Sequence, residues 1–351
     1  MQRYQFEITR SFVVDVLTSY DVLRPHAEVI ADRMLEADLR GQDGHGVFRL
    51  VPYCQRLDEG GYNLRPEIVL THDSSVRALV DGDDGFGQVA VTEAVRIAIE
   101  KATEHGLAWV GTRRSNHAGA GGVYARMALE HDLIGIYMAI GNANHLPAWG
   151  GLDLLLSTNP MAFAIPAGEE PGVVLDMATT VASYGRIKVY ADRGEELPVG
   201  WLEDRTGTPI TDPARAAEGL LTPIGGYKGY GLNLVVGALA GVLNGAAFGS
   251  EVIDFNKDFK NPTNTGQLII AMRPDLFGSV DDFKHAIDVR IREMKASEPM
   301  PGRGPVRIPG DSVPGREADM RANGIPIAEP VVGRLIGLAE RRGIDAEFLS
   351  A

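Results

Sequence analysis

The spacing of hydrophobic residues changes near residue 66, and this change divides the chain into a helical part and a mixed part. Before it, apolar side chains recur three and four residues apart. This spacing predicts two helices within residues 9–40 and a third over residues 47–60, which a pair of glycines ends. Residues 1–65 are therefore expected to form a helical domain.

After this point, short apolar runs alternate with helical patterns. The stretch 87–106, "GQVAVTEAVRIAIEKATEHG", predicts an amphipathic helix that Gly106 ends, and residues 121–132 predict a second helix. Such an alternation is typical of a mixed α/β sheet domain, here residues 66–274. Strands are expected at residues 67–70, 76–82, 107–114, 133–142, 161–167, 173–178 and 267–274.

The C-terminal part is again helical. Residues 280–297 predict an amphipathic helix, and the Pro/Gly/Arg-rich loop "PMPGRGPVRIPGD" follows it, so residues 275–324 are expected to form a helical extension with a loop. The last helix must bury an apolar stripe, and we expect residues 325–351 to pack back on the N-terminal helices. The predicted class is α/β: a helical N-terminal domain, a mixed-sheet domain and a helical C-terminal extension.

Composition and charge exclude some classes of function. Of the 351 residues, 44% are hydrophobic and 23% are charged, which is typical of a globular protein. The formal net charge of −13 argues against a nucleic-acid partner, because phosphate recognition needs clustered Lys and Arg. The single cysteine, Cys54, excludes an internal disulfide and favours the reducing cytoplasm, and the first ten residues show no apolar signal segment.

One segment resembles a membrane span. Residues 232–247, "LNLVVGALAGVLNGAA", are apolar, but they are shorter than the run of roughly 20 residues that a span needs. The segment also contains Gly237 and Gly241. We predict a buried helix that neighbouring elements approach closely at these glycines, and no membrane partner.

Standard cofactor and metal signatures are missing from the sequence. Neither G-x-G-x-x-G after a strand nor G-x-x-x-x-G-K-[ST] occurs, and "GGYKGYG" (225–231) lacks the spacing of a phosphate loop. Three histidines, His117, His131 and His145, fall on different predicted elements. No metal site is therefore expected.

Several loops rich in small residues follow predicted strands. "SNHAGAGG" (115–122) opens a helix and exposes N–H groups that suit a pyrophosphate, and "AIGNANHLPAWGG" (139–151) and "LDMATT" (175–180) add further polar groups. Lys228 precedes the apolar segment, where it can neutralise phosphate or lie along the surface. Each loop alone is typical of an ordinary turn. Together they favour a long, polar, anionic ligand, and a dinucleotide fits.

The segment "DGHGVFR" (43–49) holds a histidine and an arginine four residues apart. If residues 46–57 are helical, His45 and Arg49 share a face. A guanidinium can bind a carboxylate through two hydrogen bonds, and an imidazole can exchange a proton near neutral pH. The pair could hold a 2-oxo acid and protonate its carbonyl oxygen. The alternative is a turn with an exposed histidine and a surface cation, and these seven residues alone leave both possibilities open.

Five motifs together resemble a known family. "ADLRGQDGHGVFRL", "SNHAGAGG", "LSTNPMAFAIP", "LDMATT" and "GGYKGYGL" occur in the order seen in the malate/L-lactate dehydrogenase family of the non-Rossmann type. That family includes ureidoglycolate, sulfolactate and diketogulonate dehydrogenases and cyclic-imine carboxylate reductases. The resemblance covers nearly the whole chain. It implies a homodimer whose helical domain lies on the substrate side and whose sheet domain binds NAD(P) without the Rossmann fingerprint.

The resemblance also implies roles for individual residues. His45 matches the catalytic histidine and Arg49 the arginine that binds the substrate carboxylate. In some members the histidine matching His117 is the proton acceptor, so two histidines compete for one role. Thr158 matches a substrate contact. The residues implied at the cofactor are His117, Ala118, Gly119, Ala120, Gly121, Asp176, Met177, Ala178, Lys228, Arg303 and Arg307.

The sequence departs from the family pattern at three positions. Gly44 replaces a serine that many members have before the catalytic histidine, and Ala118 replaces the usual phenylalanine. Arg186 stands where an ungapped count from Asp176 puts the aspartate of the Ser–His–Asp relay described for the cyclic-imine reductases. These departures count against the imine reductases, and the smaller Ala118 is expected to enlarge the pocket.

We therefore expect an NAD(P)-dependent oxidoreductase that acts on a small 2-hydroxy or 2-oxo acid, with NAD favoured over NADP. A cyclic-imine carboxylate reductase is one alternative. A nucleotide-binding module without catalysis is another, favoured by Gly44 and Ala118. A hydrolase that uses the histidines and Asp176 is a third, and it would need no nicotinamide. The sequence leaves open the substrate, the choice of cofactor, the proton donor, the stereochemistry and the physiological direction.

Overall fold

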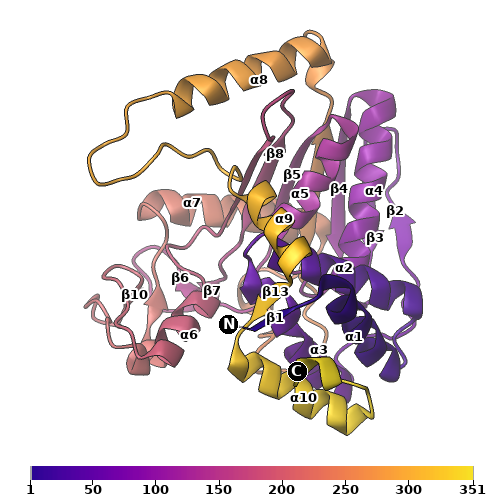
Figure 1. Ribbon diagram of the computed structural model, residues 1–351, viewed down its shortest axis with the longest axis vertical. Coiled ribbons are helices and arrows are strands. Elements are labelled where there is room, and N and C mark those ends of the chain that lie inside the picture. The colour runs from indigo at the N-terminus through magenta and orange to yellow at the C-terminus, as the bar shows by residue number, and fades with distance from the viewer. Residues whose placement is uncertain (1, 351) are drawn as a thin grey trace.

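A mixed seven-stranded sheet forms the centre of the protein (Figure 1). The computed structural model describes residues 2–350. In this sheet only one neighbouring pair of described strands, β3 and β4, is parallel. The predicted α/β class with a mixed sheet is confirmed, and the strand pattern is not that of a doubly wound parallel sheet. The strands in spatial order are β2 (Val69–Thr71), β3 (Arg77–Asp81), β4 (Leu107–Arg113), β12 (Gln267–Met272), β5 (Ile134–Ala139), β8 (Met161–Ile165) and β9 (Val173–Met177).

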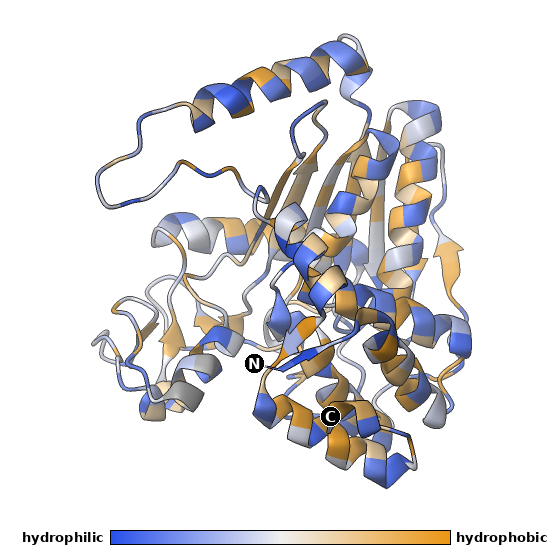
Figure 2. Cartoon of the chain, in the orientation of Figure 1, coloured by the Kyte–Doolittle hydropathy of each residue, from blue (hydrophilic) through white to orange (hydrophobic). Residues whose placement is uncertain are grey.

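The central strand β12 comes from far along the chain and joins two halves of the sheet. Its Ile269 lies opposite Val110 of β4 on one side and opposite Tyr137 of β5 on the other. A continuous apolar run suits a strand that is covered on both faces. The sheet edge is less covered: Figure 2 shows β2 as a hydrophobic strand, and its Val69 and Leu70 are 43% and 41% exposed.

Helix α4 (Gly87–His105) covers β3, β4 and β12 on one face. Its buried residues Val91, Ala94, Val95 and Ala98 recur three and four apart, as the sequence pattern predicts. Gly106 ends the helix with a φ of 87°, a left-handed conformation that favours glycine.

Helix α5 (Gly121–Ala125) lies beside α4 and contacts β5, β8 and β9. The predicted helix over residues 121–132 is only partly right, because a 3-10 turn (Arg126–His131) replaces its second half. The helix ends where it lies against β5: a Cβ at Gly135 would lie 2.1 Å from the carbonyl oxygen of Ala125. Sequence periodicity cannot reveal such a contact between a helix and a strand.

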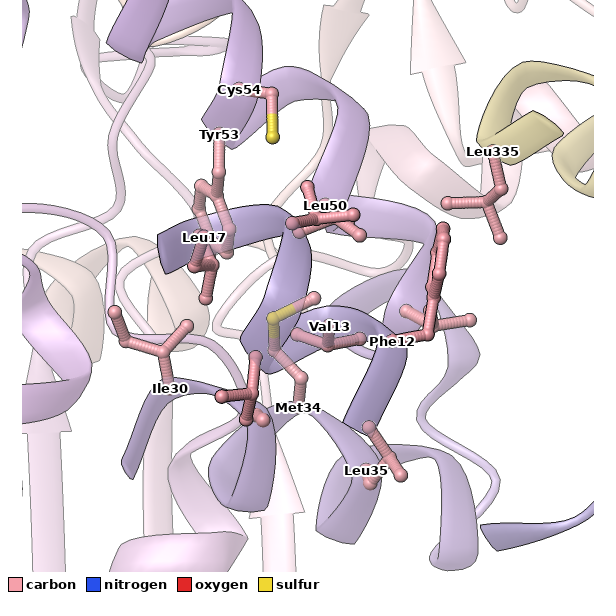
Figure 3. Packing of buried hydrophobic residues seen from close by; sticks show 14 of the residues in the cluster. Phe12, Val13, Leu17, Ile30, Met34, Leu35, Leu50, Tyr53, Cys54 and Leu335 are labelled. Atoms are coloured by element: carbon pink, nitrogen blue, oxygen red, sulfur yellow. The ribbon is translucent and has the colours of Figure 1, made fainter. Parts of the chain in front are cut away.

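The N-terminal helices α1 (Phe6–Ser19), α2 (Arg24–Leu39) and α3 (Leu50–Asp58) share one core with the C-terminal helix α10 (Glu329–Arg342). Figure 3 shows Phe12, Met34, Leu50 and Leu335 meeting in this core. Strand β1 (Gln2–Tyr4) also pairs with β13 (Ile325–Ile327), which precedes α10. Both ends of the chain thus belong to one packed unit, while the predicted domain boundaries stay a prediction.

Residues 182–221 form a small unit that the sequence pattern did not predict. Its buried residues include Ile187, Leu197, Trp201 and Ile210, which make a core of their own. Strands of two residues are too short to show a period in the sequence. The elements here are α6 (Tyr184–Arg193), β10 (Leu202–Glu203), β11 (Leu220–Leu221) and, just before the unit, β6 (Leu146–Pro147) and β7 (Leu154–Leu156).

Helix α8 (Val280–Lys295) stands away from the body of the protein, and the long loop that follows it leads back to α9 (Val313–Asn323) (Figure 1). A buried carboxylate holds this helix in place. Asp288 accepts hydrogen bonds from the backbone N–H groups of Gly168, Glu169 and Glu170 at 3.0, 2.8 and 3.1 Å. The turn between β8 and β9 is thereby attached to the middle of α8.

The apolar segment after Gly226 is α7 (Tyr227–Val236), followed by a π-helical turn (Gly237–Gly241) and a 3-10 turn (Val242–Asn244). The close approach predicted at its glycines is present: a Cβ at Gly237 would lie 2.1 Å from the ring of Phe248. Because the phenyl ring packs directly on the backbone, this position requires glycine.

The prediction that this segment is a buried helix is wrong. Leu232, Val235, Val242 and Leu243 are 43%, 52%, 63% and 61% exposed. One side of the segment packs on the sheet, and the other side faces outward. A segment that is apolar on all sides carries no periodicity that could tell these sides apart. Within residues 2–350, no helix combines the length and the apolar character that crossing a membrane requires.

We predict that Leu17→Ala lowers the free energy of unfolding by about 2–5 kcal/mol, because it removes a fully buried side chain from the helical core and leaves a cavity. Ile8→Ala on the same helix is the control, since Ile8 is 47% exposed and should cost about 1 kcal/mol or less. Urea unfolding followed by circular dichroism measures both. Equal losses for the two variants would contradict the packing described for α1.

Candidate active site

The histidine and arginine of "DGHGVFR" lie on two consecutive 3-10 turns, Asp43–His45 and Val47–Arg49. The prediction that they share a face of one α-helix is therefore wrong, since α3 begins only at Leu50. Instead, Nε of Arg49 donates to the carbonyl oxygen of Gly44 at 2.7 Å. This hydrogen bond folds the arginine back toward the histidine turn.

A buried carboxyl group shapes this bend. Oδ2 of Asp38, on α2, accepts a hydrogen bond from the backbone N–H of Val47 at 2.8 Å. A Cβ at Gly46 would lie 1.7 Å from Oδ1 of Asp38, so only glycine fits there. At Gly44 a Cβ would meet no atom within 4 Å. Packing therefore explains the second glycine of "DGHG", whereas a serine in place of Gly44 would fit.

The structure brings His45 and His117 together from different parts of the chain. His117 lies in the loop between β4 and α5, and its ring stacks on that of His45 with 5.5 Å between centroids and 15° between planes. The same loop contains the other residues predicted there: Ala118 and Ala120 are buried, Gly119 has a φ of 87°, and Gly121 begins α5. Ala118 is part of the core under the sheet, so here its small side chain is a packing feature.

Two further buried side chains complete the histidine cluster. The hydroxyl oxygen of Tyr53, on α3, lies 2.6 Å from Nδ1 of His117, and Nε2 of Gln88, at the start of α4, donates to the same oxygen at 2.7 Å. Both side chains are fully enclosed. Sequence reasoning missed both residues. The only signal was the position of Tyr53 one helical turn after Arg49.

Burial makes both histidines neutral. It lowers the pKa of His45 to about 3 and the pKa of His117 well below its usual value, and the positive charge of Arg49 lowers both further. Burial also lowers the pKa of Arg49 itself. A neutral imidazole has one N–H donor and one acceptor nitrogen, so each ring can form hydrogen bonds of both kinds with a polar ligand.

Arg49 is a half-buried cation without an anionic partner. Within residues 2–350, its guanidinium forms only the hydrogen bond from Nε to Gly44, and no carboxylate lies within salt-bridge distance of it. A carboxylate bound through the two terminal nitrogens would supply the missing anionic partner. The cluster of Arg49, His45 and His117 is therefore suited to a small carboxylic acid.

The carboxylate of Asp176, at the end of β9, connects the helical domain to the sheet. Its Oδ2 accepts hydrogen bonds from Nε2 of Gln42 at 2.6 Å and from the backbone N–H of Gly122 at 2.7 Å. One of the N–H groups that we predicted for a pyrophosphate is thus already bound to Asp176. That part of the "SNHAGAGG" prediction is wrong, because only the tertiary structure places a carboxylate at the start of α5. The neighbouring Met177 and Ala178 are half-buried.

Hydrogen bonds between side chains gather three more segments. The side-chain amide of Asn233, on α7, donates to the carbonyl oxygen of Ser157 and to Oγ1 of Thr179 at 2.7 and 2.8 Å. The backbone N–H of Thr179 in turn donates to the carbonyl oxygen of Thr158 at 3.0 Å. Thr158, the "LDMATT" segment and α7 therefore meet at one end of the sheet.

The remaining basic residues lie outside the histidine cluster. Lys228 is exposed in the first turn of α7. Arg303 and Arg307 are exposed on the loop after α8, which Figure 1 shows away from α3. The structure does not bring these two arginines to the histidines. Arg186 lies over the ring of Trp201 at 5.1 Å, in the small unit that contains α6.

No group of three or more His, Cys, Asp or Glu side chains suited to a metal ion occurs in the described part of the chain. His145 instead stacks on Tyr184 with 4.5 Å between ring centroids. The chemistry that the cluster itself offers is proton exchange by an imidazole and anion binding by a guanidinium.

Known proteins similar to this chain share these features of length and fold. A family model described as malate/L-lactate dehydrogenase matches residues 4–336. The malate dehydrogenase of Pyrococcus abyssi is 38% identical over 346 residues, which are 95% of this chain and 93% of that protein. The match therefore spans both the helical domain and the sheet.

Two solved structures extend the comparison to the fold. The sulfolactate dehydrogenase of Methanocaldococcus jannaschii has a TM-score of 0.89 and 34% identity, and the match covers 99% of each chain. The Δ1-piperideine-2-carboxylate reductase of Pseudomonas syringae has a TM-score of 0.86 and 29% identity, covering 97% of this chain and 100% of that one. Both resemblances extend over the whole architecture.

We predict that Asp38→Asn removes a pH dependence of stability. Burial raises the pKa of Asp38 from 3.8 to about 8, so the folded protein favours the protonated carboxyl group. Its contribution to stability is complete at low pH and is lost as the pH rises from 3.8 toward about 8. An asparagine oxygen can still accept the hydrogen bond from Val47 but has no proton to lose.

Urea unfolding at about pH 6 and about pH 8 tests this prediction. From about pH 6 to about pH 8, the urea midpoint of the wild type should decrease relative to that of Asp38→Asn. Asp281→Asn, which changes an exposed carboxyl group on α8, is the control and should follow the wild type. Parallel curves for wild type and Asp38→Asn would contradict the assignment.

Proposed function

Because the chain belongs to the malate/L-lactate dehydrogenase family, we propose that it is an oxidoreductase that transfers a hydride between a nicotinamide dinucleotide and a small 2-hydroxy or 2-oxo carboxylic acid. The relatives named above are dehydrogenases of malate and of sulfolactate, both of which are hydroxy acids. For this chain we propose a substrate of the same chemical class, a hydroxy acid, and we name no individual acid.

The half-buried guanidinium of Arg49, which has no anionic partner, carries the proposal. Its positive charge contributes to the lowered pKa of His45 and of His117, and no carboxylate of the described protein lies within salt-bridge distance of it. A substrate carboxylate would supply the missing partner through two parallel hydrogen bonds. It would also place the neighbouring carbon and oxygen of the substrate beside the imidazoles, which is what general acid–base catalysis needs.

The residues around the cluster fit a dinucleotide. A Cβ at Gly119 would meet only the carbonyl oxygen of His45, at 3.9 Å, so the loop before α5 leaves open space beside the histidine turn. Lys228 stands in the first turn of α7, where its charge and the helix N-terminus both favour phosphate. In this proposal Thr158, Asp176, Met177 and Ala178 contact the part of the cofactor between these two places. When bound, the nicotinamide supplies or accepts the hydride.

We propose NAD rather than NADP as the preferred cofactor. NADP carries an additional 2′-phosphate that needs its own cation. Lys228 is the one predicted cofactor-loop cation that lies near the ends of the strands, and it serves the pyrophosphate in this proposal. Arg303 and Arg307 lie on the exposed loop after α8. The preference is therefore tested with both cofactors and with Arg303→Ala and Arg307→Ala.

A second candidate is the reduction of a cyclic imine carboxylate. The observation that favours it is the similarity to the piperideine-carboxylate reductase structure, whose name gives such a substrate. Arg49 would bind the carboxylate of either class. The absence of serine at Gly44 and of aspartate at Arg186 counts against the imine, since that subgroup is described with both. A panel that contains both 2-oxo acids and cyclic imine carboxylates separates the two.

We predict that Arg49→Ala raises the KM for the 2-oxo acid by about 100-fold or more, because a buried charge-assisted pair is worth roughly 2–5 kcal/mol. His45→Ala should lower kcat by roughly 10²–10⁴-fold and leave NADH binding nearly unchanged. Loss of NADH absorbance with the substrate panel measures turnover, and NADH fluorescence measures binding.

The control is Arg334→Ala. Arg334 is exposed and contacts the same Phe48 ring as Arg49, at 5.5 Å compared with 5.7 Å, so its removal should leave the KM unchanged. NADH binding without consumption would favour the non-catalytic module, and turnover without nicotinamide would favour the hydrolase. Either result would contradict the proposed function. An unchanged KM in Arg49→Ala would remove the carboxylate contact.

We further propose a cytoplasmic homodimer formed through the exposed side of α7 and the turns after it. Leu232, Val235, Val242 and Leu243 expose a contiguous apolar stretch, which is typical of an interface between proteins. The buried free thiol of Cys54 suits a reducing compartment. No other chain is needed to complete the histidine cluster in this proposal.

We predict that Val242→Glu shifts the protein from dimer to monomer, because it places a charge in a dry apolar contact. Sedimentation velocity measures the shift. Ile8→Glu on α1 is the matched control, since Ile8 is also apolar and exposed but lies on another element. A wild-type monomer, or an unaffected Val242→Glu dimer, would contradict this interface.

A further inference from the structure

Tyr53 is buried in an aromatic enclosure that fixes its ring. Phe86 and Phe255 pack edge-on against it, each with 5.9 Å between ring centroids and 88° between planes. The position of the Tyr53 hydroxyl oxygen is therefore fixed. It has two polar neighbours, Nδ1 of His117 at 2.6 Å and Nε2 of Gln88 at 2.7 Å.

The direction of each hydrogen bond follows from what these groups can donate. Nε2 of an amide is a donor only, so the oxygen of Tyr53 accepts from Gln88. A phenol has one proton, and Nδ1 of His117 is the remaining partner in reach. Burial raises the pKa of Tyr53, so the hydroxyl keeps that proton. Tyr53 therefore donates to Nδ1, which must be unprotonated.

We propose that Tyr53, oriented by Gln88, is a positioning residue that holds His117 as the neutral tautomer with its proton on Nε2. This inference rests on the proposed function for its catalytic meaning, although the tautomer itself does not depend on it. Within residues 2–350, Nε2 of His117 has no hydrogen-bond partner and is not among the enclosed polar atoms. The Nε2–H group is thus free to donate to a substrate oxygen.

The two histidines then have different roles. In a neutral imidazole whose Nε2 carries the proton, Nε2 has no lone pair for a second proton, and the only acceptor nitrogen, Nδ1, is occupied by the hydroxyl group of Tyr53. His117 is therefore a hydrogen-bond donor that stabilises developing negative charge on the substrate oxygen. His45 has no protein partner on either nitrogen in the described structure, and its Nδ1 is enclosed. Nothing in the protein dictates which of its nitrogens carries the proton.

His45 is consequently the group that exchanges the proton. In the oxidation direction, the proton of the substrate hydroxyl moves to the unprotonated nitrogen of His45, which becomes an imidazolium. When bound, a nicotinamide would accept the hydride from the substrate carbon, and the carbon–oxygen bond would become a carbonyl. The oxygen keeps its hydrogen bond from His117 throughout. In the reduction direction the same proton returns from His45.

The orientation of one amide group decides between this arrangement and its opposite. If Gln88 presented its oxygen, Tyr53 would donate to it, and His117 would have to donate from Nδ1. Nε2 of His117 would then be the acceptor, and His117 would be the base. Gln88→Glu produces that opposite state once its carboxyl group is ionised, because an ionised carboxylate accepts hydrogen bonds and cannot donate them. Burial raises the pKa of a carboxyl group at this position, so the spectrum of this variant is recorded at a pH high enough to ionise it.

The experiment measures the tautomer of His117 directly, without substrate. Two-bond ¹H–¹⁵N correlation spectra of the ¹⁵N-histidine-labelled full chain distinguish the two tautomers by which ring nitrogen is protonated. The signal is assigned by its loss in His117→Gln. We expect Nε2–H in the wild type, a mixture of tautomers in Tyr53→Phe and Nδ1–H in Gln88→Glu. Nδ1–H in the wild type, or a tautomer unaffected by Tyr53→Phe, would overturn the proposal.

Activity gives an independent readout. Tyr53→Phe should lower kcat on the order of 10²-fold while the KM and NADH binding change by about twofold or less, since the ring packing is kept. His117→Gln should retain more activity than His117→Ala, because an amide can donate but cannot accept a proton. Equal loss in both would assign proton exchange to His117 and overturn the division of roles. If the wild type turns over no hydroxy acid yet shows the Nε2–H tautomer, only the proposed function fails.

Discussion

The carboxylate of Asp176 is the contact on which the site depends, because it joins segments that the chain brings from three places. It ends a strand of the sheet, accepts from Gln42 just before the histidine turn, and accepts from Gly122 at the start of α5. The helical domain and the sheet are thereby held at a fixed spacing. Together with the hydrogen bond between Tyr53 and His117, this contact keeps the turn that carries His45 beside the loop that carries His117.

Enclosure between these two layers then sets the charge state of the cluster. Removing water penalises charged groups and so lowers the pKa of both histidines, and the positive charge of Arg49 lowers both further. No carboxylate of the described chain lies within salt-bridge distance of this guanidinium. An acidic substrate completes the site electrostatically, which connects the fold to the proposed chemistry.

Polar groups around the histidines orient the reactive side chains. Tyr53 and Gln88 contact no predicted ligand, yet their hydrogen bonds decide which nitrogen of His117 faces the open side. Asp38 acts in a comparable way on the turn that carries His45, through the N–H of Val47 and the close approach at Gly46. The reactive groups are thus oriented by neighbours that never need to touch the substrate.

Local patterns determined much of this architecture. The 3.6-residue period of residues 87–106 specified α4 up to its glycine end, and short apolar runs specified the strands, because these elements depend on neighbours in sequence. The motif order also identified the family and suggested His45, Arg49 and His117. The two-residue strands near Trp201 and the exposed side of α7 could not be predicted from the sequence, because neither produces a periodic pattern of hydrophobic residues.

What only the tertiary structure decided is which groups meet and which remain free. The sequence places Asp176 beside a possible phosphate turn, whereas the fold gives one of that turn's N–H groups to Asp176 itself. The sequence places Tyr53 and Gln88 in two separate helices, whereas packing brings Gln88 to the hydroxyl group of Tyr53 and that hydroxyl group to His117. Hydrogen bonds between residues far apart in the chain follow from the positions of whole elements, and no local spacing encodes those positions.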